Sequence, residues 1–312
     1  MKENFDKKFK KGKLEKVSFF EQFENFIESS KTTKKSNVIK AYRTTLNKLK
    51  EFESLYKNKI TFTSIDISFY DKFLSYLINK NQYLNNTAGN YIKHIKTFMN
   101  FCYQRKIHDN NEYKNFKVFK EESQSIYLTD AELKKIENLD LSFGDRLNNI
   151  KNVFLLQCYT GLRYSDLIKL TQEDIKNDFI IIRTVKTKDE INIPISPKAR
   201  KLLDNLDGLN FKFVSNQKMN SYLTEIGIRA GIDEPFKNIL YRGSERIEKI
   251  LPKYEMLSTH TARRTFITLS LEKGMRPEVV MKITGHKDYK SFKRYVKLTD
   301  NVAKEEVTRA WI

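Results

Sequence analysis

Cysteine and histidine are both scarce in this sequence. Among 312 residues there are two cysteines, Cys102 and Cys158, and four scattered histidines. A small disulfide-stabilised domain needs several cysteine pairs, and a protein metal site needs cysteine, histidine or carboxylate ligands that cluster. The composition therefore excludes a disulfide framework and disfavours metal-dependent nuclease chemistry.

Long apolar runs are also missing. No stretch approaches the ~18 uncharged apolar residues that a membrane-spanning helix needs. The first 16 residues, MKENFDKKFKKGKLEK, contain no apolar core of a signal peptide. We therefore expect a cytoplasmic protein.

Acidic residues are too few to balance the basic ones. The chain has 58 Lys plus Arg against 39 Asp plus Glu, a formal net charge of +19. Residues 1–126 contribute +11 and residues 127–312 contribute +8. Basic proteins of this kind bind nucleic acid through phosphate contacts, and charge on both halves predicts a clamp around the partner. Membrane-surface binding normally requires a concentrated basic amphipathic helix, and here the excess charge is spread along the chain. Surface charge that serves solubility alone remains an alternative.

The length and the hydrophobic pattern predict two domains. Residues 1–16 are expected to form a flexible basic arm. Residues 17–107 contain four helical stripes of apolar residues, residues 108–125 resemble a polar linker, and residues 126–312 form the second domain. The four stripes consist of Phe19, Phe20, Phe23 and Phe26; Val38, Tyr42, Leu46 and Leu49; Phe69, Phe73, Tyr76 and Leu77; and Tyr91, Ile95, Phe98, Phe101 and Cys102.

The second domain is expected to be mainly helical with a small β-hairpin, an α+β fold. Thr129 begins a capping box in front of an apolar helix. The segment 178–196 is the exception to the helical pattern, because two β-branched runs, 179–185 and 191–195, flank a polar loop that holds Lys186 and Lys188.

Three short clusters in this domain carry reactive or charged residues. The first is TGLRYSD, in which Thr-Gly ends one helix, Ser165 can cap the next, and Asp166 can brace Arg163. The second is HTAR, in which His260 and Arg263 share a helix face. In the third, Pro277 opens a helix and Gly285 ends it, so that His286 lies at a turn, with Tyr295 nine residues later on the next predicted helical stretch.

Taken in order, these residues resemble the tyrosine recombinase, or phage integrase, family. That family joins an Arg in a T-G-L-R-x-x-E/D box to a hairpin Lys, His-x-x-Arg, Gly-His and a Tyr. The resemblance implies a helical core-binding (SAM-like) domain, a catalytic domain, and the catalytic set Arg163, Lys186, His260, Arg263, His286 and Tyr295, with Asp166 in support, where the family often has Glu.

Phosphodiester cleavage without a metal or other cofactor requires a nucleophile, a general acid and fixed positive charge. Tyr295 can supply the nucleophile and form a 3′-phosphotyrosine, with Tyr289 as an alternative. Both arginines can hold the non-bridging oxygens. By resemblance, Lys186 is the general acid, with Lys188 as its rival. His260 exchanges the tyrosine proton, and His286 binds a phosphate oxygen.

The resemblance also implies double-stranded DNA as the partner, two domains on opposite faces of the duplex, and an association with the nucleoid. A homotetramer on DNA would be coupled by the tail 300–312, which carries Val302, Val307 and Trp311, although self-packing of the tail fits equally. Integration, excision or inversion of DNA would follow; a type IB topoisomerase and a non-catalytic DNA-binding regulator are the alternatives. Further phosphate contacts are predicted at Lys72, Lys93, Lys96, Arg105, Lys106, Lys188 and Arg264.

Overall fold

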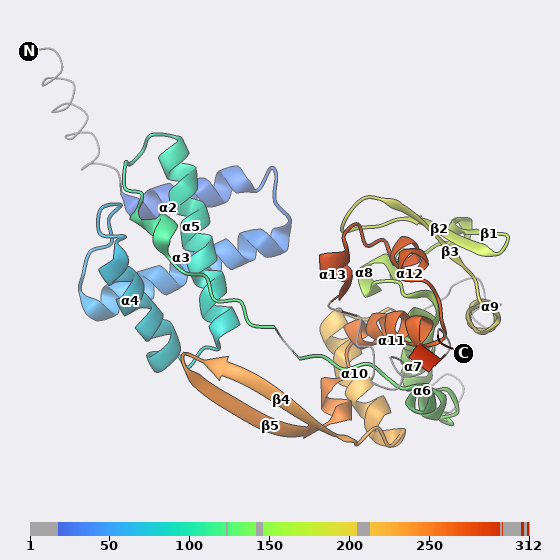
Figure 1. Cartoon of the computed structure of the whole chain (residues 1–312). Helices are drawn as coiled ribbons and strands as arrows, with labels where there is room; N and C mark the ends of the chain where they lie inside the picture. The colour runs from blue at the N-terminus through green and yellow to red at the C-terminus, as the bar shows by residue number, and fades with distance from the viewer. Residues whose placement is uncertain are drawn as a thin grey trace, which may run out of the picture. The chain divides into compact units, whose positions relative to one another are not determined.

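The computed structural model describes residues 18–122, 124–141, 146–204, 213–293, 295, 307–308 and 311. The predicted arm, residues 1–16, and most of the predicted tail helix, including Val302, lie outside these residues. The chain forms two compact units (Figure 1). The first takes in the residues up to 123 together with 239–248, and the second takes in 124–238 and the residues from 249 onward.

The first unit contains the four predicted helices. They are α2 (Phe19–Ser30), α3 (Ser36–Tyr56), α4 (Ile67–Ser75) and α5 (Asn85–Gln104), with a π-turn η1 (Tyr76–Lys80) after α4. The side chains of Ser18 and Asp66 cap α2 and α4. Phenylalanines dominate the core, where the rings of Phe23 and Phe98 lie 4.2 Å apart and are both fully buried. The aromatic stripes therefore form a core rather than a base-stacking surface.

The segment predicted as a linker begins inside this unit. His108 is buried, and the 3₁₀ turn η2 (Glu112–Asn115) places Tyr113 and Phe116, each 2% exposed, in the aromatic core. The side chain of Lys96 on α5 supports the turn, because its ammonium donates hydrogen bonds to the carbonyls of Lys114 (2.8 Å) and Phe116 (2.6 Å). The chain therefore leaves the first unit after η2 and not at residue 108.

The tip of a second hairpin, residues 239–248, completes the first unit, and the sequence did not predict this hairpin. Strands β4 (Pro235–Arg242) and β5 (Glu245–Pro252) form a two-stranded sheet. At its tip, the buried amide of Asn85 accepts a hydrogen bond from the N–H of Gly243 (2.7 Å) and donates one to the Gly243 carbonyl (3.0 Å). Arg242 also donates to the side chain of Gln82 (2.6 Å). A buried side-chain amide thus pairs with the hairpin backbone as a neighbouring strand would.

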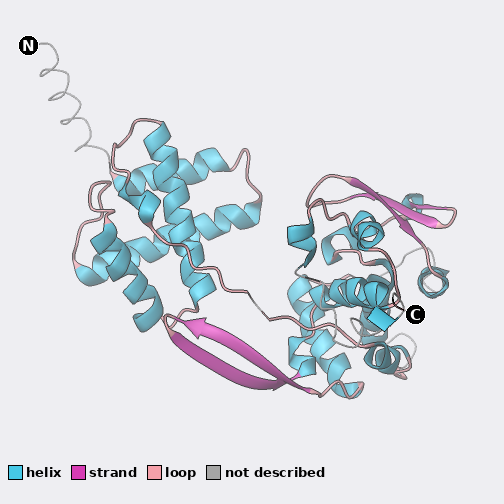
Figure 2. Cartoon of the chain, viewed as in Figure 1, coloured by secondary structure: helices cyan, strands magenta, loops and turns pink. Residues whose placement is uncertain are grey.

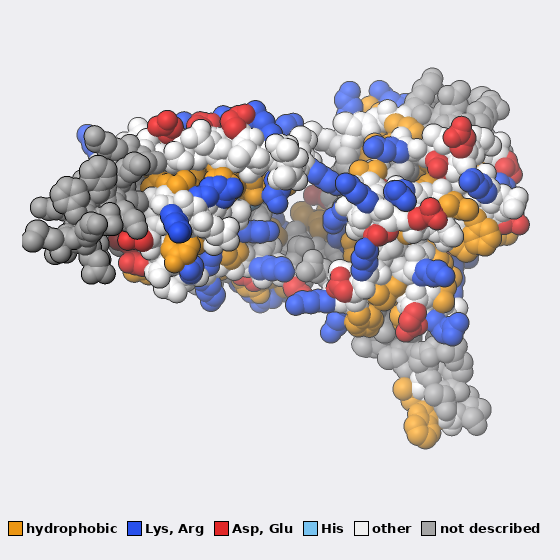
Figure 3. Space-filling model, turned by 90° about the horizontal axis from the view of Figure 1, so that it is seen from above, with side chains coloured by type: hydrophobic (Ala, Val, Ile, Leu, Met, Phe, Trp, Pro, Cys, Tyr) orange, Lys and Arg blue, Asp and Glu red, His pale blue; other side chains and the backbone are white. Residues whose placement is uncertain are grey.

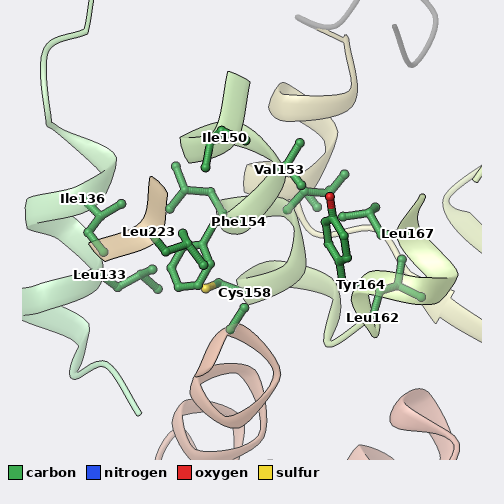
Figure 4. Close-up of a cluster of buried hydrophobic side chains, with 14 of the residues drawn as sticks. Leu133, Ile136, Ile150, Val153, Phe154, Cys158, Leu162, Tyr164, Leu167 and Leu223 are labelled. Atoms are coloured by element: carbon green, nitrogen blue, oxygen red, sulfur yellow. The ribbon is translucent and has the colours of Figure 1, made fainter. Parts of the chain in front are cut away.

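The second unit is built around α7 (Arg146–Thr160) and α11 (Thr259–Glu272), which pack together. Figure 4 shows side chains of its core, including Phe154 and Cys158 from α7 and Leu223 from α10. Figure 2 shows that helices predominate in this unit. Its other elements are α6 (Asp130–Glu137), α8 (Tyr164–Leu167), η3 (Gln172–Asp174), α9 (Pro197–Asp204), α10 (Asn216–Arg229), η4 (Lys253–Met256), α12 (Pro277–Thr284) and α13 (Tyr289–Lys293).

The hairpin predicted over 178–196 is present in this unit. Strands β1 (Ile175–Lys176), β2 (Phe179–Arg183) and β3 (Glu190–Pro194) form an antiparallel sheet in the order β1-β2-β3. Ile180 pairs with Ile193 and Ile182 with Ile191, and all four are buried, so one face of the sheet joins the core. The polar loop between β2 and β3 carries Lys186.

Cys102 and Cys158 are buried free thiols, one in each unit. None of the helices among the described residues is long and apolar enough to cross a membrane.

Candidate active site

Arg163 lies at the junction between α7 and α8. Gly161 ends α7 in the left-handed conformation, with a φ of +69°, and a Cβ atom there would lie 2.5 Å from the Phe266 ring of α11. Arg163 itself is the N-cap residue of α8, so the prediction that Ser165 caps this helix is wrong. The side chain of Arg163 is only 14% exposed, and its Nη1 atom has no hydrogen-bond partner.

Asp166 connects this arginine to the hairpin. Its side chain is 1% exposed, with Oδ2 lying 3.8 Å from Nη1 of Arg163. The Oδ1 atom accepts a hydrogen bond of 2.8 Å from the N–H of Val185. Because Val185 precedes Lys186, the carboxylate both balances the arginine and fixes the start of the lysine turn.

The turn between β2 and β3 presents Lys186 and Lys188. It is closed by hydrogen bonds from the N–H of Thr184 to the Asp189 carbonyl (2.8 Å) and from the N–H of Lys188 to the Thr184 carbonyl (3.0 Å). Both lysine side chains are exposed, and the Lys188 backbone is left-handed, with a φ of +61°. Lys186 is the lysine of this turn whose charge contributes to lowering the pKa of His260 and of His286.

His260 and Arg263 lie in the first turn and a half of α11, whose N-terminus is capped by a box between Ser258 and Thr261. Arg263 is 1% exposed. Its guanidinium donates to the Gly161 carbonyl (2.7 Å) and to the Thr284 carbonyl, and its Nη2 lies 3.5 Å from Nε2 of His286. Arg263 therefore joins the Arg163 segment to the Gly-His turn.

The Gly-His turn follows α12 as the sequence predicts. Pro277 occupies the first turn of the helix, and Gly285 ends it in the left-handed conformation with a φ of +65°. His286 Nδ1 lies 2.7 Å from Thr284 Oγ1, which donates to the Val280 carbonyl. Since the threonine hydroxyl donates elsewhere and arginine can only donate, the proton of a neutral His286 belongs on Nδ1 and the lone pair on Nε2 faces Arg263.

Tyr295 lies beside this histidine. It is in a turn beyond α13, closed by its own N–H and the Phe292 carbonyl (2.8 Å), and not on a helix as predicted. Its ring centroid lies 5.1 Å from that of His286. Tyr289, the alternative nucleophile, instead begins α13, and its side chain is 56% exposed.

The site is strongly positive. Desolvation and the charges of Arg264, Arg263, Lys186 and Arg163 lower the pKa of His260. Desolvation, followed by the two neighbouring arginines, lowers the pKa of His286 to about 3. Burial and Arg163 also lower the pKa of Arg263, which remains charged at neutral pH. Both imidazoles are therefore neutral near pH 7, surrounded by permanent cations.

Family models match both units. Residues 18–118 match the phage integrase SAM-like domain, and residues 127–302, more than half of the chain, match the phage integrase family. The chain belongs to the phage integrase family. Among the relatives of this integrase is a tyrosine recombinase of Pseudothermotoga lettingae, 24% identical over 257 residues, which cover 79% of this chain and 82% of the relative.

Solved structures share the fold of the integrase. A lambda integrase dimer bound to a COC′ core site is similar, with a TM-score of 0.71 at 14% identity, covering 89% of this chain and 95% of the other. A lambda integrase tetramer bound to a Holliday junction gives a TM-score of 0.70 at 15% identity, covering 90% and 78%.

Four residues of the integrase site were not predicted to have a role. Thr284 orients His286, and Thr268 of α11 donates to the Tyr295 carbonyl (3.1 Å). Asp189 pairs with Lys287 (2.8 Å) and thereby joins the lysine turn to the Gly-His turn. Thr284 stands within the Thr-Gly-His motif, which was a signal for its role. The other two contacts link distant segments and have no local signal. No group of three potential metal ligands occurs in the described part of the chain.

The predicted DNA contacts differ in their surroundings. Lys72, Lys93, Lys106 and Lys188 are exposed. Arg105 is also exposed, but its guanidinium lies 3.4 Å above the Phe101 ring and donates to the Phe101 carbonyl (3.2 Å). The ammonium of Lys96 is engaged by two carbonyls, which favours a structural role over the predicted phosphate contact. Arg264 is half-buried beside Tyr295.

Proposed function

We propose that Tyr295 is the nucleophile with which this integrase cuts and rejoins DNA through a 3′-phosphotyrosine. The family membership identifies the chain as a tyrosine site-specific recombinase, and mobile-element recombination fits its phage and transposon relatives. The assignment of residues rests on the contacts of Arg263. Its guanidinium contacts both the segment that holds Arg163 and His286, whose ring lies beside that of Tyr295.

Two arginine atoms support a phosphate site. Nη1 of Arg163 and Nε of Arg263 are buried and have no hydrogen-bond partner. Buried donors are normally satisfied, so unpaired ones point to a ligand. In the proposed reaction, the two guanidinium groups bind the non-bridging oxygens while the tyrosine oxygen bonds to phosphorus and the bond to the 5′ oxygen breaks. The phosphotyrosine ester conserves the strand's bond energy, so rejoining needs no cofactor.

Proton transfer is assigned to the exposed turn and to the neutral histidines. Lys186 gives its proton to the departing 5′ oxygen, and its charge is close enough to influence both histidines. His260, neutral near pH 7, can accept the phenol proton of Tyr295. His286 would need a second proton to donate to the phosphate from Nε2, and the negative phosphate favours that protonation.

DNA is proposed to contact both units, since lysines and arginines lie on the surface of each (Figure 3). Phosphate contacts release counterions, so binding should weaken steeply with salt. We expect at least a 10³-fold loss of affinity between about 50 and 200 mM salt if six or more phosphates are bound. A flat response measured by fluorescence anisotropy would refute a clamp on DNA.

A homotetramer on DNA, coupled by the tail, is part of the same proposal. Lambda integrase forms a tetramer on a Holliday junction. In the present chain, Val307 and Trp311 are 61% and 87% exposed, which leaves apolar area for a neighbouring subunit. Truncation after Thr299 should preserve binding to a single site and impair the assembly of paired sites. Unchanged synapsis in a gel-shift assay would exclude the tail as the coupling element.

The nucleophile is tested by covalent capture. On a nicked suicide duplex, the wild-type chain should form a DNA adduct that survives denaturation, whereas Tyr295→Phe should bind with unchanged affinity and form none. Tyr289→Phe is the matched control and should still be captured. An adduct that persists in Tyr295→Phe and disappears in Tyr289→Phe would transfer the assignment to Tyr289. Recombinant junctions from two duplexes distinguish this activity from that of a type IB topoisomerase.

A further inference from the structure

Arg264, the residue after Arg263, has an unusual environment for a half-buried arginine. Its guanidinium carbon lies 5.9 Å from the centroid of the Tyr295 ring. Within the described ranges, the structure gives Arg264 no hydrogen bond and no ion pair. Its neighbour on the chain, Arg263, by contrast donates to the carbonyls of Gly161 and Thr284 through Nη1 and Nη2. The Tyr295 ring therefore takes the place that an anionic partner would have beside the Arg264 guanidinium.

The geometry of α11 explains why this arginine reaches the tyrosine. Residues four apart share a face of a helix, so Arg264 and Thr268 project on the same side of α11. The hydroxyl of Thr268 donates to the backbone carbonyl of Tyr295 (3.1 Å), while Arg264 lies over its ring. One helix face thus holds both the main chain and the side chain of Tyr295.

The His286 ring limits the tyrosine further, with its centroid 5.1 Å from that of Tyr295. His286 is itself fixed by Thr284 and Arg263, so it is a rigid neighbour. Burial lowers the pKa of Arg264, and the negative charge that Tyr295 gains on losing its proton acts in the opposite direction. The two groups therefore interact electrostatically as well as through contact.

We propose that Arg264 is a positioning residue for the nucleophile, and this rests on the proposed role of Tyr295. Its guanidinium holds the phenol ring by a cation–π contact and keeps a positive charge near the ring as the phenol loses its proton. As the tyrosine O–P bond forms, the P–O5′ bond breaks, the phenol proton passes to His260, and the 5′ oxygen takes a proton from Lys186. Arg264 assists the loss of the phenol proton and the formation of the tyrosine O–P bond.

The test separates the rate of attack from DNA binding. In single-turnover assays with saturating protein and a nicked suicide duplex, Arg264→Met should form the covalent adduct about 2- to 30-fold more slowly, the range expected for loss of a cation–π contact. DNA affinity should change less than twofold. Arg264→Lys, which retains a cation, should recover most of the rate. Arg229→Met, which removes an exposed arginine paired with Glu225 on α10, is the control for a lost charge and should cleave normally.

A modified substrate provides a second readout. When sulfur replaces the bridging 5′ oxygen, the leaving thiolate needs no proton from a general acid. Lys186→Ala should regain activity on this substrate, whereas Arg264→Met should not, because its defect lies in the nucleophile. A purely structural loss would lower the rates on both substrates and would not be reversed by lysine at position 264.

Two outcomes would overturn the proposal. If Arg264→Met weakens DNA binding, lowers the salt slope by about one, and cleaves at the wild-type rate when saturated, Arg264 is the phosphate contact predicted from the sequence. If the sulfur substrate rescues Arg264→Met as fully as Lys186→Ala, Arg264 assists the leaving group. Capture of DNA by Tyr295→Phe would instead refute the proposed function, so the two failures are distinguishable.

Discussion

Replacing Gly161 by alanine tests how the Arg163 segment is held. Gly161 and Gly231 both adopt left-handed backbone, with φ of +69° and +63°. A Cβ at Gly161 would lie 2.5 Å from Cδ1 of Phe266, whereas a Cβ at Gly231 has no atom within 4 Å. The two sites therefore share backbone strain and differ in steric overlap.

The expected magnitudes follow from these two contributions. Left-handed strain costs about 1–2 kcal/mol for a residue with a Cβ, and overpacking in a core costs about 1–3 kcal/mol. Loss of entropy in the unfolded chain offsets about 0.4–1 kcal/mol for Gly→Ala. Strain and overpacking together should make Gly161→Ala lower the free energy of unfolding by about 2–4 kcal/mol. Strain alone should make Gly231→Ala lower it by about 1 kcal/mol.

Hydrogen exchange of the α7 and α11 amides reports this free energy within the second unit. Gly161→Ala should also cleave DNA more slowly than Gly231→Ala, because the Gly161 carbonyl accepts the 2.7 Å hydrogen bond from Arg263. Equal losses of protection in the two variants would show that the Phe266 ring moves aside freely, and the expected cost of steric overlap at Gly161 would be wrong.

Three further predictions concern other contacts. Asn85→Ala removes both hydrogen bonds to Gly243 and should lower the free energy of unfolding of the first unit by about 1–3 kcal/mol, with faster exchange of the Gly243 amide. Asp166→Asn retains an acceptor for Val185 but leaves the charge of Arg163 unbalanced, so single-turnover cleavage should change more than melting temperature does. His286, with its pKa lowered to about 3, binds a proton more readily when unfolded; its contribution to stability should be complete above about pH 6.5 and decline as pH falls toward 3, and His286→Asn should flatten that part of a pH titration of urea midpoints.

Local signals made several elements predictable. The capping box at Thr129, and Pro277 with Gly285 at the two ends of α12, are satisfied by residues a few positions apart. The β2–β3 hairpin was predictable because two runs rich in isoleucine flank a polar loop. In each case the chain segment itself contains the interactions that define its structure.

Elements that depend on distant partners were missed. Strand β5 begins with a run of mostly charged residues, β4 has no regular alternation of apolar and polar residues, and only the Gly243-Ser244 pair gave a turn signal. The segment from residue 108 resembled a linker because most of its residues are polar, although two of its aromatic residues, Tyr113 and Phe116, are buried in the core. Their burial depends on helices that lie earlier in the chain.

The site was predictable as a set of residues but not as an arrangement. Order and spacing identified Arg163, Arg263 and His286 by resemblance. The carbonyl contacts of Arg263 and the orientation of Arg264 over Tyr295 depend on how α11 packs against its neighbours, which no local pattern encodes.

The hydrogen bonds between Asn85 and Gly243 join residues 158 positions apart in the chain. This separation affects how the first unit folds during synthesis and which segments can be grafted between relatives. At a synthesis rate of roughly 5–20 residues per second, α5 leaves the ribosome roughly 8–30 seconds before its partner exists. The first unit must wait for most of the second to be translated before it is whole. A chimera joined at residue 123 would therefore receive a foreign hairpin tip, and grafts between relatives should transplant residues 239–248 together with the amino-terminal segment.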